Sequence, residues 1–205
     1  MRPSANRFQP FNHTQPNRYP WLFSYVREAL GDDAGHRLLS FGCSIGDEVF
    51  ALRSYFPSAT IKGIDIDLPN IAECRRRVPP LGMAEIEFAV ADSMAGEPAG
   101  SYDAIFCLAV LCNGTLTVTD AQRSDPILYF ANFERMVEDF ARCLKPGGFL
   151  CLVTTNFRFC DTKVAGDFEV VLTIADDLLA PDILFDRDNR RMAGARYAET
   201  VFRKR

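Results

Sequence analysis

Two short apolar segments, residues 38–41 and 61–64, constrain the fold of this chain more than any other feature. The first runs into the small residues of 42–46, and the second ends at Asp65. This pattern is typical of buried strands in a parallel sheet, whose carboxyl ends open into a polar crevice. Small residues let a ligand approach the backbone, and an acid at the next strand tip can hold a pair of ribose hydroxyls. The two segments therefore indicate a site for a cofactor that contains a nucleoside.

Strand and helix patterns alternate along the rest of the chain, which predicts a right-handed, doubly wound α/β fold with a mostly parallel sheet. The carboxyl-terminal part lacks convincing helices, so we expect it to end in antiparallel strands. Residues 113–126 show no clear element, and Lys-Pro-Gly-Gly at 145–148 is expected to stop a long helix sharply. The expected helices are 20–30, one from about 47, 69–77 and one from about 126 to 144, and the expected strands are 37–41, 60–65, 85–91, 102–109, 149–154, 168–174 and 197–203, with a short additional strand at 182–185.

The overall composition argues against several classes of protein. A chain of 205 residues is long enough for one large domain with a sizeable core. Its net charge is -4, whereas a non-specific nucleic-acid binder is typically basic. The longest apolar run, residues 105–112, is too short for a bilayer span of about 20 residues. No signal peptide is evident at the amino terminus. We therefore expect a cytoplasmic protein that does not contact a membrane.

The cysteines agree with that compartment. There are seven of them, an odd number, and no two are spaced as Cys-x-x-Cys. The only histidines, His13 and His36, lie near none of them in sequence. This pattern argues against a zinc site and against a disulfide framework. We expect reduced, buried thiols and no bound metal.

The loop after the first strand narrows the choice of cofactor. A dinucleotide fold has Gly-x-Gly-x-x-Gly here, whereas this chain has Gly42-x-Ser44-x-Gly46 without the third glycine. A P-loop would need Gly-Lys followed by Ser or Thr, which the sequence lacks. Asp47 and Glu48 would repel a phosphate and would tolerate a cation. These features favour S-adenosylmethionine (SAM) over NAD or ATP, because SAM has a ribose, no phosphate, and two cationic groups.

With these motifs in order, the chain resembles the class I SAM-dependent methyltransferases over about residues 37–203. The resemblance implies a three-layer αβα fold around a seven-stranded sheet with a terminal antiparallel strand, and it implies SAM as the cofactor. It also implies that Asp65 binds both ribose hydroxyls and that Asp92 accepts from the adenine amino group. The expected cofactor-binding residues are Gly42, Cys43, Ser44, Gly46, Glu48, Asp65, Ile66, Asp92, Ser93, Cys107 and Arg18.

The first residue of the cofactor loop departs from the family. The family usually has an acid where this chain has Ser40, which leaves the amino group of SAM to Glu48 or Asp47. Residues 42–48 and 106–111 also resemble the CheR-type chemoreceptor glutamate methyltransferases, although the Arg-Asn pair of those enzymes is missing. We therefore expect the cofactor geometry of that group without its receptor substrate.

The methyl acceptor is expected over the carboxyl ends of the fourth and fifth strands. Methyl transfer mainly requires that the nucleophile is held close to the methyl group and that water is excluded. A general base is needed for a protonated hydroxyl or ammonium and not for a carboxylate. The acceptor is predicted to be a small molecule or a protein. The candidate catalytic residues are Asn113, Asn156, Arg158 and Tyr19.

Two parts of the chain are expected. Residues 1–36 would form a lead segment and a helix that cover the cofactor and substrate, with Arg18 meeting the methionine carboxylate, and residues 37–205 would form the SAM-binding methyltransferase domain. Ser40 leaves open a catalytically silent SAM-binding protein or regulatory partner. An NAD-dependent oxidoreductase on the same kind of sheet is a further alternative, and an RNA methyltransferase is disfavoured by the acidic charge.

Overall fold

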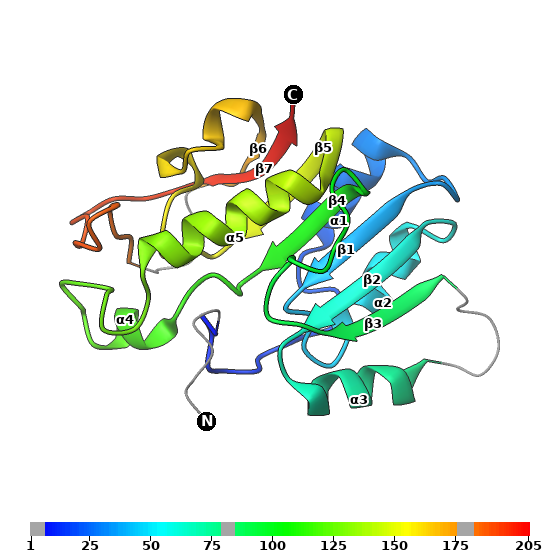
Figure 1. The fold of residues 1–205 in the computed structure, drawn as a ribbon, viewed down its shortest axis with the longest axis horizontal. Helices are drawn as coiled ribbons and strands as arrows, with labels where there is room; N and C mark the ends of the chain where they lie inside the picture. The colour runs from blue at the N-terminus through cyan, green and yellow to red at the C-terminus, as the bar shows by residue number, and fades with distance from the viewer. Residues whose placement is uncertain (1–6, 79–84, 176–182) are drawn as a thin grey trace.

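A seven-stranded sheet forms the centre of the computed structural model, which describes residues 7–78, 85–175 and 183–205 (Figure 1). The strands lie in the order β3-β2-β1-β4-β5-β7-β6. The order reverses between β1 and β4, and ligands of open α/β sheets bind in the crevice at such a point, outside the carboxyl ends of the strands. The strands are β1 (Arg37–Phe41), β2 (Thr60–Asp65), β3 (Ile86–Val90), β4 (Tyr102–Leu108), β5 (Leu144–Val153), β6 (Phe168–Thr173) and β7 (Glu199–Lys204).

The strand directions confirm the predicted sheet. The pairs from β3 through β5 are all parallel, whereas β7 runs antiparallel to both of its neighbours, β5 and β6. The carboxyl ends of β1, β2, β4 and β5 therefore meet at one edge. The fold is the expected mostly parallel α/β sheet with a terminal antiparallel strand.

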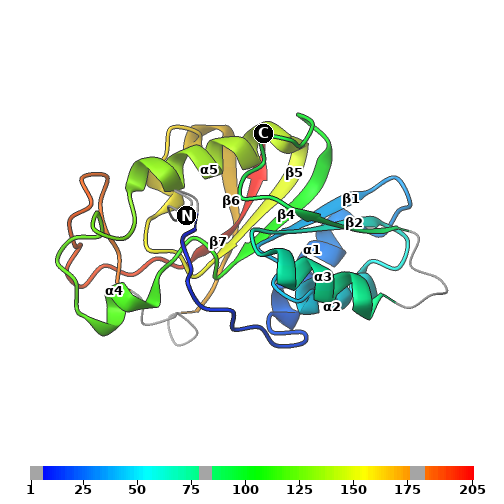
Figure 2. The same cartoon turned by 60° about the horizontal axis from the view of Figure 1, so that its bottom comes forward.

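Helices cover both faces of the sheet, which gives the expected three layers (Figure 2). Alternating residues of β1 point to opposite faces: Leu39 packs in one core cluster with Phe140, and Leu38 packs in the other with Phe23 and Val49. One face carries a single long helix, and the other carries three. The helices are α5 (Phe130–Cys143) on the first face and α1 (Pro20–Leu30), α2 (Asp47–Tyr55) and α3 (Leu68–Arg77) on the second.

Local sequence explains where the first helix begins and ends. α1 begins at Pro20, which lacks an N–H and suits the first turn of a helix, where that donor would have no helical partner. Its end is set by Gly31, whose φ of 80° lies in the region that favours glycine and whose N–H donates to the Arg27 carbonyl. This termination holds the chain that leads into β1.

Four details differ from the sequence prediction. A short helix, α4 (Gly114–Val118), lies in the stretch expected to have no element, with the Asn113 side chain accepting from the Thr115 N–H as its cap. α5 begins at Phe130 rather than near 126, because Asn189 accepts from the Phe130 N–H and a turn at Ser124 precedes it. The structure places the Pro-Gly-Gly turn inside β5, as an irregular pairing with β4. The expected strand 182–185 lies partly outside the described residues, and its described part makes only isolated bridges at Phe185.

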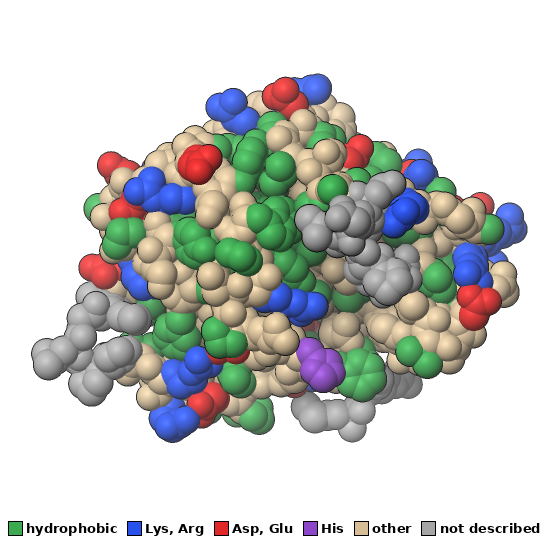
Figure 3. Space-filling model, turned by 180° about the vertical axis from the view of Figure 1, so that it is seen from behind, with side chains coloured by type: hydrophobic (Ala, Val, Ile, Leu, Met, Phe, Trp, Pro, Cys, Tyr) green, Lys and Arg blue, Asp and Glu red, His purple; other side chains and the backbone are tan. Residues whose placement is uncertain are grey.

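The surface of the molecule is mixed in charge. In Figure 3, hydrophobic side chains gather over the middle of the face opposite α5, and acidic and basic side chains are scattered mainly around its margin. Within residues 7–78, 85–175 and 183–205, none of the helices has the length and apolar character needed to span a membrane.

Candidate functional site

A crevice opens where the carboxyl ends of β1 and β2 meet the end of β4. Its lining includes Gly42, Ser44, Asp65, Ile66 and Asp92, all of which the sequence placed at the cofactor. Gly42 has a φ of 75°, and a Cβ added to it would lie 2.4 Å from a methyl carbon of Val110. Only glycine combines this backbone conformation with so close an approach.

Asp65 is the best-connected acid of the crevice. Its side chain is at the tip of β2, and the residue is 6% exposed. Oδ2 accepts from the Ser44 N–H at 2.8 Å, while Oδ1 accepts from the Asp67 N–H at 2.8 Å and from Asn70 Nδ2 at 3.1 Å. These bonds fix the carboxylate against the cofactor loop. Because a carboxylate oxygen can accept two hydrogen bonds, Oδ2 retains capacity for a further donor.

A second small space continues from the crevice toward α2 and reaches Glu48. Glu48 Oε1 and Ser40 Oγ are buried, and in the part of the chain that the structure describes neither has a partner at the distance and angle of a hydrogen bond, although the two groups are close enough for the Ser40 hydroxyl to lower the pKa of Glu48. Burial raises the pKa of Glu48 to about 8, although the nearby Ser40 hydroxyl and the positive charge of Arg18 oppose the rise. The structure thus holds an acid whose charged form needs a cationic partner.

Asp47, the other acid considered for the same contact, is already paired. Its Oδ1 lies 2.7 Å from Nη2 of Arg77 on α3, and Nη1 of Arg77 donates to the Ile45 carbonyl. Arg77 therefore ties the cofactor loop to α3 through this acid. Of the two, Glu48 is the one that faces the space beside Arg18.

The amino-terminal segment, residues 7–13, lies across the crevice and lines it. Phe8 is 2% exposed in the core, and its carbonyl accepts from Asn113 Nδ2. The Asn12 amide exchanges hydrogen bonds with Asn70 and accepts from Ser44 Oγ at 3.2 Å. With this segment in place, the free volume of the crevice is about 90 Å³.

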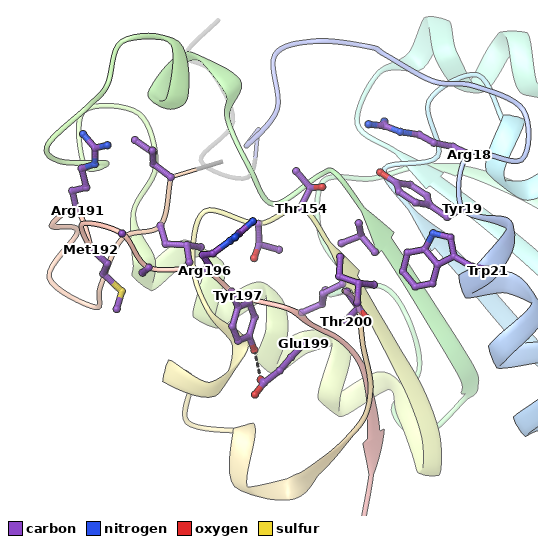
Figure 4. Close-up of a pocket in the computed structure, with 18 residues that line it drawn as sticks. Arg18, Tyr19, Trp21, Thr154, Arg191, Met192, Arg196, Tyr197, Glu199 and Thr200 are labelled. Atoms are coloured by element: carbon purple, nitrogen blue, oxygen red, sulfur yellow. Dashed lines mark hydrogen bonds between the residues drawn. The ribbon is translucent and has the colours of Figure 1, made fainter. Parts of the chain in front are cut away.

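A larger cavity of about 580 Å³ lies beyond the carboxyl end of β5. Figure 4 shows Arg18, Tyr19 and Trp21 on one wall and Arg196 reaching in from the loop opposite, with Thr154 between them. Arg18 and Tyr19 also line the small space beside Glu48. The two sites therefore share a wall.

The backbone is strained where the two sites meet. Ala109 and Thr154, which directly follow β4 and β5, have φ values of 57° and 58°. A β-branched residue such as Thr154 rarely adopts this conformation, and strain of this kind clusters at functional sites. The strand tips are therefore held in a shape that local preferences do not favour.

The structure assigns a scaffold role to two of the candidate catalytic residues. The Asn156 side chain accepts from the Asn113 N–H at 2.6 Å and donates to the Ile183 carbonyl at 2.9 Å, and it is fully buried. Asn113 caps α4 and holds the Phe8 carbonyl. Both amides are occupied by the chain itself and line none of the three spaces described above.

Arg158 and Tyr19 differ in their surroundings. Arg158 makes a two-pronged ion pair with Asp161, with both contacts at 2.8 Å, and it lines none of these spaces. Tyr19 lines both the large cavity and the space beside Glu48, and burial raises the pKa of its hydroxyl. Of the four candidates, Tyr19 is the one that the structure brings to the junction.

A family model described as "Methyltransferase domain" matches residues 39–152, more than half of the chain. The chain belongs to this family. The expectation of a class I SAM-dependent methyltransferase is thereby confirmed at the level of the family and the fold, and the NAD-dependent oxidoreductase is no longer an alternative.

Curated relatives of this methyltransferase-domain chain differ in what their names say they act on. It is 30% identical over 156 residues, 76% of this chain and 42% of the relative, to ribosomal RNA small subunit methyltransferase C of Chromohalobacter salexigens. It is 27% identical over 144 residues, 70% of this chain and 46% of the relative, to a fatty-acid O-methyltransferase of Mycolicibacterium smegmatis. The chain thus spans less than half the length of both relatives.

Solved structures support the fold of the methyltransferase domain. Haemonchus contortus phosphoethanolamine N-methyltransferase 2, solved with S-adenosylhomocysteine, matches with a TM-score of 0.51 and 18% identity, over 81% of this chain and 32% of that chain. The YcgJ protein of Bacillus subtilis matches with a TM-score of 0.50 and 19% identity, over 68% of this chain and 52% of that chain.

Three residues that the family motifs placed at the cofactor lie behind the crevice rather than in its lining. Gly46 caps α2 with a φ of 92°, and a Cβ there would meet Phe50 and the Cys74 sulfur. Cys107 is fully buried in the core, and Ser93 is half-buried next to Asp92.

Sequence reasoning placed the amino-terminal segment over the cofactor without naming Asn12 and its neighbours in the crevice, and it missed the loop residues of the large cavity. Asn12 and Arg196 belong to no motif, and they reach their sites through contacts between segments far apart in the chain. Asn12 lies within a polar stretch next to Phe8 and Phe11, and an aromatic pair in such a segment was the available signal of docking.

Proposed function

We propose that this chain binds SAM in the crevice and transfers its methyl group to a small-molecule acceptor in the adjoining cavity. The observation that carries the proposal is the buried Glu48 oxygen without a partner, close to Arg18. An acid and a guanidinium lining one space suit the ammonium and carboxylate of an amino acid. This pair fits the methionine end of SAM, and it would disfavour a phosphate.

The remaining contacts follow the order of the crevice. Asp65 has an oxygen with spare acceptor capacity at the tip of β2, where it would hold the ribose hydroxyls. Ile66 and Asp92 line the crevice beside Asp65, where they would lie next to the adenine. Glu48 would bind the ammonium and Arg18 the carboxylate. When bound, SAM supplies an activated methyl group, so the protein has to orient the acceptor and exclude water.

Residues 7–13 would act as the movable cover of the cofactor site. Sites for ligands of this size measure roughly 300–1,000 Å³, whereas the covered crevice has about 90 Å³. The segment must therefore shift before SAM can enter. This agrees with the proposed division into a covering part, residues 1–36, and a SAM-binding domain, residues 37–205.

A small-molecule acceptor is favoured over a macromolecule. The names of the relatives include both a ribosomal RNA and a fatty acid as the target. The cavity of about 580 Å³ is in the size range of small-molecule sites, and a net charge of -4 opposes RNA binding. The finer resemblance to CheR-type enzymes and a cytoplasmic location stay predictions of the sequence.

Calorimetry with SAM tests the cofactor half of the proposal. Asp65→Ala is expected to weaken binding by about 2–4 kcal/mol, because two charge-assisted hydrogen bonds are lost. Asp125→Ala, which removes a half-buried acid paired with Arg123 outside the crevice, is the matched control and should bind normally. If the wild type does not bind SAM, the proposal is wrong. If it binds SAM but transfers no methyl group to any acceptor, the catalytically silent alternative is favoured.

A further inference from the structure

The cavity beside the cofactor crevice has features that restrict its ligand. Resting on the proposed function, the residues that line the cavity indicate the chemical class of the methyl acceptor. The cavity begins at Val153 and Thr154, the end of β5, and extends to Ile183 and Leu184 in the carboxyl-terminal loop. It is in the size range of cavities that enclose drug-sized ligands.

Apolar side chains form much of the wall. Trp21 and Leu152 lie on the side of α1 and β5, and Ile174, Leu184 and Met192 belong to the segments opposite. A ligand that buries its surface here gains about 25 cal/mol for each Å² of apolar area. The body of the ligand is therefore apolar or aromatic.

The charges of the described lining residues are mainly positive. Among these described residues, the charged ones are three arginines, Arg18, Arg191 and Arg196, and one acid, Glu199. Glu199 accepts from the Tyr197 hydroxyl at 2.7 Å, at one end of the cavity, while Arg196 extends toward the middle (Figure 4). Arg191 is paired with Asp120, which lies outside the lining. An ammonium would be repelled by this set and an anion attracted.

Groups that could remove a proton from an acceptor are scarce. Among the described lining residues there is no histidine, and the one carboxylate, Glu199, has one of its two oxygens bonded to the Tyr197 hydroxyl. Burial raises the pKa of the Tyr19 and Tyr197 hydroxyls, which therefore stay protonated and act as donors. An acceptor that reaches this cavity has to be nucleophilic without losing a proton there.

We propose that the cavity binds a small carboxylic acid with an apolar body and that its carboxylate oxygen is the methyl acceptor. Arg196 and the Tyr19 hydroxyl supply the charge and the donor that hold the anion, and the apolar wall holds its body. The acceptor oxygen forms the new C–O bond as the methyl–sulfur bond breaks, and the bonding pair stays on sulfur. The anion and the sulfonium both become neutral, and no proton is transferred.

Binding can be measured without SAM, because Trp21 lines the cavity and is the only tryptophan of the chain. The full chain is titrated with 2-naphthoate, with decanoate, and with the matched amine 2-naphthylmethylamine, following tryptophan fluorescence. At least one carboxylate is expected to shift the signal in a saturable way, and the amine is expected to leave it unchanged. Tighter binding of the amine, or a response to none of the three, would overturn the proposal.

Variants locate the anion. Arg196→Gln is expected to weaken carboxylate binding about tenfold, because a charge-assisted hydrogen bond is lost. Arg190→Gln removes an exposed arginine of the same loop that does not line the cavity, and it should leave binding unchanged. Equal loss in both variants would mean that general surface charge attracts the anion, which contradicts a built site.

Product analysis separates this inference from the proposed function. With methyl-labelled SAM and the bound carboxylate, the label should appear in a methyl ester that releases methanol in base. Label in an amine or a phenol, with none in esters, would overturn the carboxylate assignment and leave methyl transfer intact. Failure of the wild type to bind SAM by calorimetry would reject the proposed function, while carboxylate binding at Trp21 would still support the anion site.

Discussion

Buried polar side chains near the cofactor crevice and near the acceptor cavity differ in whether the chain itself supplies their hydrogen-bond partners. On the cofactor half, Glu48 Oε1 and Ser40 Oγ lack a partner in the described part of the chain. On the acceptor half, Asn156 is fully buried and both ends of its amide are bonded. Burying a polar atom without a partner costs about 1–3 kcal/mol, so the first arrangement lowers stability and the second supports it.

This difference separates binding groups from scaffold groups at one sheet edge. A polar group that the chain has already satisfied has little left to offer a ligand, whereas an unsatisfied one gains most from a ligand that completes it. From the sequence, Asn113 and Asn156 are candidate catalytic residues and Glu48 is a candidate partner of the SAM amino group. The following changes test whether the contrast holds.

The largest effect is expected for Asn156→Ala. The change leaves the Asn113 N–H and the Ile183 carbonyl without their partner, which should lower the free energy of unfolding by about 3–5 kcal/mol. Urea denaturation measures the loss. Thr155→Ala, next in sequence and half-buried, serves as the control; it removes one hydrogen bond, from its hydroxyl to the Phe157 carbonyl, and should cost about 1 kcal/mol. Near-normal stability combined with lost methyl transfer would return Asn156 to the catalytic residues.

Glu48→Gln should have the opposite sign. Because burial raises the pKa of Glu48 from 4.5 to about 8, the folded chain favours the protonated form. The contribution of the protonated Glu48 to the free energy of unfolding is fully present below about pH 4.5 and is lost as the pH rises through about 8. Glutamine stays neutral, so the variant should match the wild type near pH 4 and exceed its unfolding free energy by about 2–4 kcal/mol at pH 9.

The same variant should bind SAM about 10–100-fold more weakly, since a charged contact to the ammonium is lost. Thermal or urea unfolding across pH 4–9 and calorimetry give the two readouts. A variant that is less stable at pH 9, or that binds SAM as tightly as the wild type, would break the contrast between the two halves. Asp47→Asn is the contrasting variant: that acid already has Arg77 as its partner, so its replacement should lower stability at pH 9 rather than raise it.

Several residues of the proposed cofactor half could be brought together from the sequence because their signals are local. Residues 42–46 and Asp65 belong to strand ends whose hydrophobic pattern fixes their position in a parallel sheet, and the sheet then brings them together. The helices and strands were predicted to within a few residues for the same reason. The exceptions include α4 and the start of α5, where the contacts of Asn113 and Asn189 outweigh local propensity. The early start of β5 and the strand expected at 182–185 are the other two.

The acceptor half was not predictable in this way. Its wall is assembled from α1, the end of β5 and the loop before β7, and no pattern in any one segment signals the others. Whether Asn156 is satisfied depends on Ile183, which lies 27 positions further along the chain. Such pairings are set by tertiary packing, which short sequence motifs do not predict.

A moderate effect is expected where the cofactor loop crosses the end of β4. In Gly42→Ala, the added Cβ would lie 2.4 Å from a methyl carbon of Val110, at a φ of 75°. We expect about 1–3 kcal/mol less stability and weaker SAM binding, because both the loop and β4 must shift. Gly96→Ala, where a Cβ meets open space, is the control. Unchanged SAM affinity in Gly42→Ala would mean that the cofactor does not depend on this loop shape.

The smallest effect concerns the segment that covers the crevice. Arg7 forms an exposed ion pair with Asp67, next to the Asp65 carboxylate. Such a pair contributes about 0.5–1 kcal/mol, so Arg7→Ala should shift the segment toward its open position by about two- to fivefold. Stopped-flow measurements should then show SAM association accelerated by this factor at low salt, and high salt should make the wild type resemble the variant.

The direction of the Arg7→Ala effect decides what the segment does. Faster association with little change in dissociation means that the segment competes with SAM for Asn70 and Ser44, which Asn12 now occupies. Slower association, or faster dissociation, would instead mean that residues 7–13 hold the bound cofactor. Arg76→Ala removes an exposed pair with Glu73 on α3 and should change neither rate. Because the acceptor cavity shares no residue with this segment, carboxylate binding followed through Trp21 should be the same in both variants.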